Sequence, residues 1–250
     1  MRRLIPLLLL ALIGCAGTSP AAESPMEADA SAGELSALPA KPGAASAETG
    51  LRRLGTGARA TLLYVPKSHG AAKPAPLIVM LHGAGGSGQH SMELVKASAD
   101  RLGFMVLAPS SRAPSWDIIS SRNYGVDVRA LDAALKQVFS EYAINPKRVA
   151  IGGFSDGASY ALSIGIINGE LFSDIIAFSP GFIAPTREEG RPRIFISHGV
   201  ADRVLPIDIC SRSIVPRLKS SGYSVDYREC PAGHTVPPNI ARAAYEAFAT

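Results

Sequence analysis

The stretch Arg148-Val149-Ala150-Ile151-Gly152-Gly153-Phe154-Ser155-Asp156-Gly157 decides the fold. Its residues 148–152 form a short apolar run typical of a buried strand, and a helical pattern follows over 158–168. Between them, one glycine stands two residues before Ser155 and another two residues after it. A serine on so tight a strand–turn–helix connection adopts a strained backbone, and glycines at those two places relieve the contact between strand and helix. A glycine-rich connection with an incidental serine is the alternative, and the flanking strand and helix argue against it.

Short apolar runs alternate with longer amphipathic segments from Arg59 to the C-terminus. Several of these runs are continuous rather than alternating, as expected for parallel strands buried on both faces. The predicted strands are Ala60–Val65, Leu77–Leu81, Phe104–Ala108, Arg148–Gly152, Ile175–Phe178, Arg193–Ser197 and Ser224–Arg228. The predicted helices include Val126–Tyr142, Ala158–Asn168, Ile207–Ser220 and Asn239–Phe248. This alternation predicts an α/β domain with a mostly parallel, twisted sheet and helices on both faces, over residues 51–250.

Ligands bind beyond the carboxyl ends of the strands in such sheets, and three further motifs lie at those ends. His82-Gly83-Ala84-Gly85-Gly86 follows the strand at 77–81. Small residues there allow backbone N–H groups to approach an anion closely. The segment lacks the Gly-Lys-Ser/Thr ending of a phosphate-binding loop and the GxGxxG pattern of a dinucleotide site. We therefore interpret it as an anion-stabilising turn in which His82 is structural.

The other two motifs supply a carboxylate and an imidazole. The segment His198-Gly199-Val200-Ala201-Asp202 follows the strand at 193–197, and Ala232-Gly233-His234-Thr235 follows the strand at 224–228. Asp208 is the competing carboxylate, but it falls within the predicted helix 207–220. A carboxylate is needed to hold the tautomer of a catalytic imidazole and to stabilise its protonated form.

These motifs resemble those of the α/β-hydrolase superfamily, and the stretches GFSDGA and GHTVPP are most similar to its phospholipase/carboxylesterase branch, which includes acyl-protein thioesterases. The resemblance implies the α/β-hydrolase fold, with Ser155 as nucleophile, His234 as general base and Asp202 as the acid that orients it. It also implies an oxyanion hole made by the N–H groups of Ala84 and Asp156. The turn reads HGAGG where the lipase and esterase branch has HGGG.

The function implied is that of a serine carboxylesterase that forms an acyl-enzyme, with no cofactor and no metal. Residues 179–192 carry no helical apolar stripe that would form a large lid, so we expect a small ester with a short acyl chain as substrate. Trp116, in the loop 109–124, either lines the substrate pocket or packs beneath that loop. A thioesterase, phospholipase or lipase would use the same triad. The alternative of another class is a non-catalytic surface lipoprotein that binds lipids or sugars.

The N-terminus resembles a bacterial lipoprotein signal. An apolar run over 4–13 follows Arg2 and Arg3 and ends in Leu12-Ile13-Gly14-Cys15, the pattern of a lipobox. We expect residues 1–14 to be a signal peptide, Cys15 to carry lipid and residues 15–50 to be a disordered tether. The mature protein would then be exported and held at the cell envelope by its lipid alone. An ordinary signal peptide with an incidental Cys15 is the alternative.

Composition limits the partners. The formal net charge of +4 over 250 residues is weak and scattered, which argues against nucleic acid. Cys210 and Cys230 are a candidate disulfide for an exported chain, although the sequence leaves open whether they bond. The spacing of cysteine and histidine does not suggest a metal site. We expect a monomer that acts on a small-molecule ester.

Overall fold

The computed structural model describes residues 28–40, 45–57, 59–71 and 73–250. Its centre is an eight-stranded sheet in the order β1-β2-β4-β3-β5-β6-β7-β8. The strands are β1 Gly50–Leu54, β2 Thr61–Val65, β3 Ala75–Leu81, β4 Met105–Ala108, β5 Ile144–Phe154, β6 Asp174–Phe178, β7 Arg193–Gly199 and β8 Val225–Cys230. Strand β2 is antiparallel to both β1 and β4, and every other neighbouring pair is parallel. The predicted mostly parallel sheet is confirmed.

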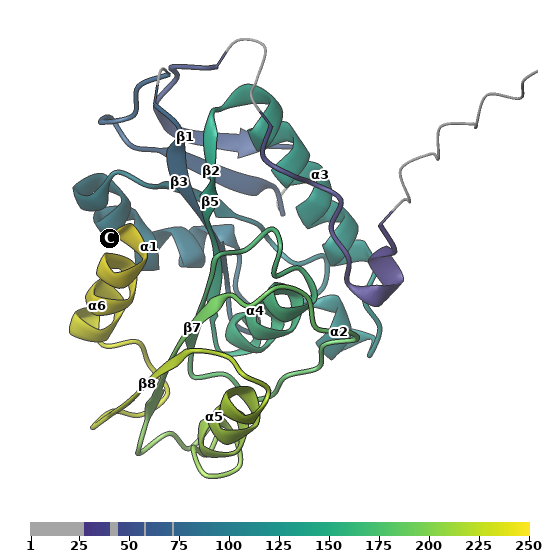
Figure 1. The fold of residues 1–250 in the computed structure, drawn as a ribbon, viewed down its shortest axis with the longest axis vertical. Helices are drawn as coiled ribbons and strands as arrows, with labels where there is room; N and C mark the ends of the chain where they lie inside the picture. The colour runs from purple at the N-terminus through teal and green to yellow at the C-terminus, as the bar shows by residue number, and fades with distance from the viewer. Residues whose placement is uncertain (1–27, 41–44, 58, 72) are drawn as a thin grey trace, which may run out of the picture.

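Helices cover both faces of the sheet, as Figure 1 shows. They are α1 Gly88–Leu102, α2 Asp117–Ser120, α3 Val126–Glu141, α4 Asp156–Ile167, α5 Ser211–Ser220 and α6 Pro238–Ala249. Side chains of α3, α4 and α5 form one core with one face of the sheet, and those of α1 and α6 form a second core with the other face. Strand β3 contributes side chains to both cores, because Leu77 and Val79 point to the first core while Ile78 and Met80 point to the second.

Strand β1, helices α1 and α2, and the short 3-10 helix Ala30–Ala32 were not among the predicted elements. Strand β1 pairs only with β2 at the edge of the sheet and carries two arginines, so its sequence lacks the apolar run of the other strands. Helix α1 buries the narrow stripe Met92, Val95 and Ala99 in an otherwise polar segment. Helix α5 begins at Ser211, later than predicted, because residues 207–210 form a turn.

The prediction of a disordered tether is wrong for residues 28–40, which lie against the domain. The amide of Leu35 donates to Oδ1 of Asn168 at 2.8 Å, and the amide of Ala37 donates to Oδ1 of Asp132 at 2.8 Å. Ala37 itself is 1% exposed. Side chains of the domain thus satisfy backbone groups of this segment, which fixes it in place.

The expected signal peptide at 1–14, the lipidated Cys15 and residues 15–27 of the tether lie outside the described residues. Among the helices that the structure does describe, none has both the length and the hydropathy needed to cross a bilayer. The predicted lipid anchor therefore stays a prediction.

Candidate active site

Ser155 lies on the turn between β5 and α4 with the strained backbone that its sequence predicts. Its φ of 57° and ψ of −121° are unusual for a residue with a Cβ and cost roughly 1–3 kcal/mol. Its amide donates to the carbonyl of Phe178 at 2.9 Å, which helps to hold the turn. A Cβ on Gly153 would lie 2.3 Å from the backbone of Gly157, and one on Gly157 would lie 2.4 Å from the carbonyl oxygen of Leu81. Only glycine fits these two positions.

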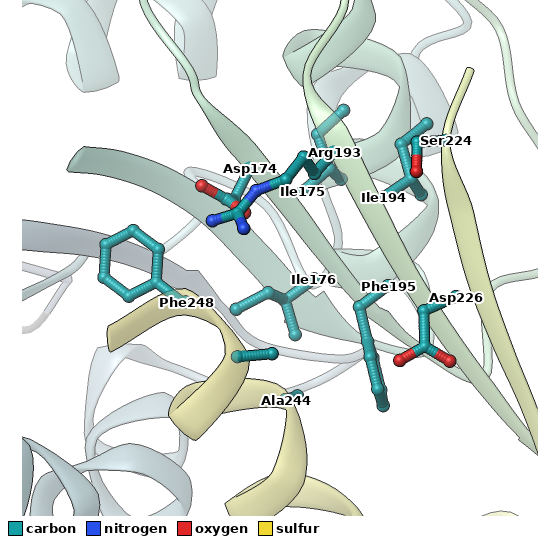
Figure 2. A pocket seen from close by; sticks show the side chains of 11 residues that line it. Asp174, Ile175, Ile176, Arg193, Ile194, Phe195, Ser224, Asp226, Ala244 and Phe248 are labelled. Atoms are coloured by element: carbon teal, nitrogen blue, oxygen red, sulfur yellow. The ribbon is translucent and has the colours of Figure 1, made fainter. Parts of the chain in front are cut away.

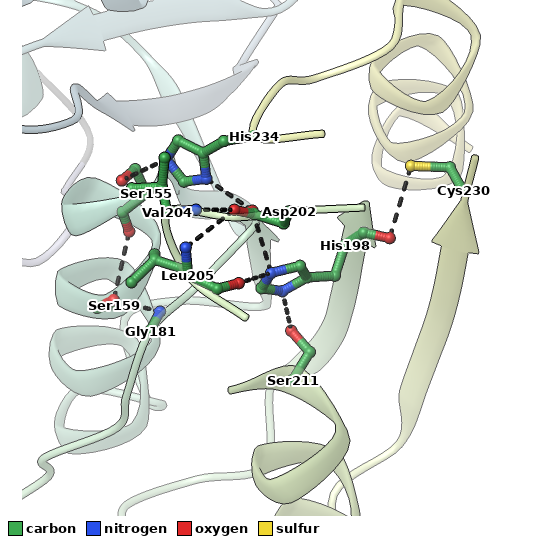
Figure 3. Close-up of polar contacts among 10 residues, drawn as sticks. All are labelled: Ser155, Ser159, Gly181, His198, Asp202, Val204, Leu205, Ser211, Cys230 and His234. Carbon is green, nitrogen blue, oxygen red and sulfur yellow. Dashed lines mark hydrogen bonds and ion pairs between the residues drawn. The ribbon is translucent and has the colours of Figure 1, made fainter. Parts of the chain in front are cut away.

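The structure brings Ser155, His234 and Asp202 together at the carboxyl edge of the sheet (Figure 3). Nε2 of His234 lies 2.9 Å from Oγ of Ser155, and Nδ1 of His234 lies 2.7 Å from Oδ2 of Asp202. A carboxylate at neutral pH only accepts, so Nδ1 carries the proton and Nε2 is free to accept the hydroxyl proton of Ser155. Ser155 is 7% exposed and the His234 side chain is 16% exposed. This is the geometry of a nucleophile, its base and an orienting acid.

Asp202 is held as a carboxylate. Its side chain is fully buried, and Oδ1 accepts the amides of Val204 and Leu205, each at 2.9 Å. Burial raises the pKa of Asp202, but the hydrogen bonds from His234 and from these two amides outweigh burial and hold it below the ordinary value of 3.8. The competing Asp208 has a side chain that is 76% exposed and pairs with Arg212, away from His234.

The two amides predicted to bind an oxyanion are in suitable places. Asp156 is the first residue of α4, and Ala84 lies in the turn after β3. Within the described part of the chain, neither amide has a hydrogen-bond partner, whereas the neighbouring amide of Gly85 donates to Pro114 at 2.7 Å. Unpartnered N–H groups, one of them at a helix N-terminus, are suited to stabilising a developing negative charge.

Trp116 does not line a substrate pocket, which corrects that prediction. It is 1% exposed, its Nε1–H donates to the carbonyl of His82 at 2.9 Å, and its ring stacks on Tyr160 with centroids 5.0 Å apart. The indole packs beneath the His82-Gly83 turn, where its ring is buried and its N–H has a hydrogen-bond acceptor. His82 is also structural, since Nδ1–H donates to Gly83 at 2.7 Å while Nε2 accepts the amide of Ser111 at 3.0 Å.

The predicted disulfide is not formed. Cys210 and Cys230 are both free and buried. Sγ of Cys230 points to the backbone carbonyl of His198, 3.5 Å away, at the end of β7 (Figure 3). Burial raises the pKa of both thiols, so they behave as small apolar groups rather than as thiolates.

A hollow of about 150 Å³ lies at the opposite edge of the sheet from the triad (Figure 2). Asp174 and Arg193, the first residues of β6 and β7, form an ion pair of 2.8 Å beside it, and Phe248 of α6 covers it. The triad follows the other ends of the strands, so this hollow takes no part in the site. Within the described residues, no group of His, Cys, Asp and Glu side chains could hold a metal ion.

Comparisons with known proteins show that the chain is similar to esterases. A model of the phospholipase/carboxylesterase family matches residues 126–249, which contain all three triad residues. The chain is 29% identical over 158 residues to a probable feruloyl esterase C of Aspergillus oryzae, covering 60% of this chain and 57% of that protein. It is 30% identical over 120 residues to an acetylxylan esterase of Coprinopsis cinerea, covering 44% of this chain and 32% of that protein. The chain thus spans little more than half the length of the curated relatives it matches first.

A solved structure shares the fold. The ferulic acid esterase of Anaeromyces mucronatus, in complex with ferulic acid, superposes with a TM-score of 0.60 at 19% identity, covering 77% of this chain and 84% of that one. At this identity the likeness shows the fold alone. The resemblance inferred from the motifs is confirmed: the chain has the α/β-hydrolase fold, and its residues 126–249 match the phospholipase/carboxylesterase family.

Proposed function

We propose that the protein is a serine carboxylesterase that works through an acyl-enzyme. The observation that carries the proposal is the continuous hydrogen-bonded chain from Oγ of Ser155 through His234 to Oδ2 of Asp202. The names of the relatives, feruloyl esterase and acetylxylan esterase, support ester hydrolysis as the reaction. A thioesterase or phospholipase would use the same three residues, and substrate tests distinguish these activities.

The geometry supports a two-step reaction. Nε2 of His234 takes the proton as Oγ of Ser155 attacks the ester carbonyl carbon, and the carbonyl oxygen becomes an oxyanion held by the amides of Ala84 and Asp156. When the intermediate collapses, His234 gives its proton to the departing alcohol, which leaves an acyl group on Ser155. Water then attacks the acyl-enzyme with His234 again as base, releasing the acid and restoring the serine. Asp202 stabilises the imidazolium in both steps.

The site favours a short acyl chain. The connection over 179–192 between β6 and β7, which the structure describes in full, contains no helix. It is fixed to α4, because the amide of Gly181 donates to Ser159 at 2.9 Å and the amide of Ala184 donates to Ser163 at 3.0 Å. A segment pinned in this way does not supply the movable amphipathic cover of a lipase. Each buried methylene contributes roughly 0.8 kcal/mol only where a pocket exists to bury it.

A second candidate substrate is an ester of a hydroxycinnamic acid, as in the names of the relatives. The loop that carries Asp202 exposes two apolar side chains, Val200 at 48% and Val204 at 65%. Exposed apolar side chains beside the acid would pack against an aromatic acyl group.

A panel of esters tests these alternatives. Catalytic efficiency should be measured on p-nitrophenyl esters from acetate to palmitate, on methyl ferulate, and on the acetyl thioester of a small thiol. We expect a maximum at short acyl chains and no increase in rate when the substrate forms micelles. A maximum at long chains with activation at micelle formation would instead identify a lipase, and hydrolysis of the thioester alone would identify a thioesterase.

We also propose that the protein is exported and anchored by lipid at Cys15, on the strength of the Leu12-Ile13-Gly14-Cys15 pattern. Fractionation of cells expressing the full chain should find the wild type with membranes and Cys15→Ser either soluble or unprocessed. A wild-type protein that is already soluble outside the cytoplasm would contradict the anchor.

A further inference from the structure

A second buried histidine contacts the acid of the triad. His198, the last residue but one of β7, places Nε2 at 3.2 Å from Oδ2 of Asp202 and at 2.8 Å from the backbone carbonyl of Leu205. Its other nitrogen, Nδ1, lies 2.7 Å from Oγ of Ser211, the first residue of α5 (Figure 3). The side chains of His198 and Asp202 have no exposed surface.

These contacts determine the tautomer of His198. A backbone carbonyl only accepts, and so does a carboxylate, so Nε2 must carry a proton to satisfy Leu205 and Asp202. Ser211 is the one partner of Nδ1 in the described structure, and its hydroxyl is able to donate. A neutral imidazole with its proton on Nε2 therefore satisfies every contact at once.

The surroundings favour this neutral form. Burial lowers the pKa of His198, and although Leu205 and Asp202 raise it, burial dominates. The charged or titratable groups that act on it are Asp202, His234 and, from β8, Glu229. A neutral donor steadies the carboxylate without neutralising it, so Asp202 keeps the full charge that His234 needs.

We propose that His198 is a positioning residue for the triad, which rests on the proposed hydrolase function. Ser211 holds the imidazole ring of His198, and this rigid ring contacts both Oδ2 of Asp202 and the carbonyl of Leu205. Oδ1 of Asp202 is fixed by the amides of Val204 and Leu205, so the carboxylate receives hydrogen bonds on both oxygens and does not rotate. Oδ2 is thereby kept in line with Nδ1 of His234.

The test replaces His198 by side chains that either keep or lose the hydrogen-bond donor. In H198Q the amide Nε2 stands close to the position of the imidazole Nε2 and still donates, whereas H198A removes the donor. S211A frees the other side of the ring, and H69Q, far from the triad in the loop after β2, is the matched control. For each, kcat and KM on p-nitrophenyl acetate are measured from pH 5 to 9, together with the melting temperature.

We expect H198A to lose kcat by about 10- to 100-fold, since displacement of a catalytic group by about 1 Å costs up to roughly 100-fold, with KM changed less than about threefold. H198Q should recover much of the loss, and S211A should show a smaller loss in the same direction. H69Q should match the wild type.

An unchanged kcat in folded H198A and S211A would overturn the proposal. So would equal losses in H198A and H198Q that follow the melting temperature alone, because these would indicate a packing role. Nitrogen NMR of the wild type gives a readout independent of activity: His198 should show the Nε2–H tautomer, and an Nδ1–H tautomer would also overturn it. A wild type that hydrolyses no ester would refute the proposed function instead, while the NMR result would still decide the tautomer of His198.

Discussion

The His-Gly dipeptides at 82–83 and 198–199 both lie at the carboxyl ends of strands, yet their imidazoles hold opposite tautomers. His82, after β3, carries its proton on Nδ1 and donates to Gly83, whereas His198, near the end of β7, carries it on Nε2, which donates to Leu205 and lies 3.2 Å from Oδ2 of Asp202. Burial lowers the pKa of both imidazoles. The first turn carries Ala84, one of the two amides proposed for the oxyanion, and the second turn carries the acid Asp202. The tautomer of His82 is set by Gly83 and Ser111, and that of His198 by Leu205 and Ser211.

Both turns act on Ser155, so removal of Ser155 or of its base His234 should have the largest effect. Ser155→Ala and His234→Ala should each lower kcat by a factor on the order of 10⁴ or more, and the double variant should be little worse because the two residues act as a unit. Steady-state kinetics on p-nitrophenyl acetate measure this. Losses that multiply in the double variant would show that the two side chains act independently.

The β7 turn is broken most directly by Asp202→Asn. The amide nitrogen of asparagine would face Nδ1–H of His234 and Nε2–H of His198, so the imidazole of His234 would no longer be held in the useful tautomer. We expect kcat to fall by a factor on the order of 10⁴. Asp208→Asn, which affects only an exposed ion pair with Arg212, is the control and should be near wild type. The reverse ranking of the two variants would contradict the assignment of the acid.

The β3 turn is tested by Trp116→Phe, which keeps an aromatic ring but leaves the carbonyl of His82 without its donor. A buried unsatisfied acceptor costs about 1–3 kcal/mol, so the free energy of unfolding should fall by that amount in urea titrations. KM for short esters should stay within about twofold of the wild type, since the indole is buried beneath the turn. A large rise in KM with unchanged stability would restore Trp116 as a substrate-binding residue.

The smallest effect concerns the pH dependence of stability. Because the pKa of Asp202 is lower in the folded state than its ordinary 3.8, the unfolded state binds the proton first as pH falls. The stabilisation from this carboxylate is therefore complete above about pH 5 and is lost as pH falls through 3.8 and then through the folded pKa. Urea unfolding at pH 7 and pH 3.5 should show a smaller loss of stability in Asp202→Asn than in the wild type. Equal losses would mean that Asp202 has the same pKa folded and unfolded.

Sequence alone predicts the residues that follow buried strands. Ser155, Asp202 and His234 follow the ends of predicted strands that the structure contains, so parallel alignment of the strands brings these residues to one edge. The glycines beside Ser155 are also predictable from the local sequence, because close backbone contacts at the turn leave no room for a side chain.

Contacts between segments far apart in the chain could not be predicted in this way. The docking of residues 28–40 depends on Asn168 and Asp132, about a hundred residues away, and no local pattern marks those two side chains as backbone acceptors. The direction of Trp116 is set by His82 and Tyr160 rather than by its own loop. The free thiols follow from the path of β8, which turns Cys230 toward the end of β7.

The reactivity of Ser155 is the central claim, and a fluorophosphonate probe tests it most directly. After labelling of the folded wild type, peptide mass spectrometry should find a single adduct, on the peptide containing Ser155. Labelling of His234→Ala should be slower by orders of magnitude, and Ser155→Ala should show none. A folded wild-type protein that does not react, or one that carries the adduct on another residue, would contradict the claim.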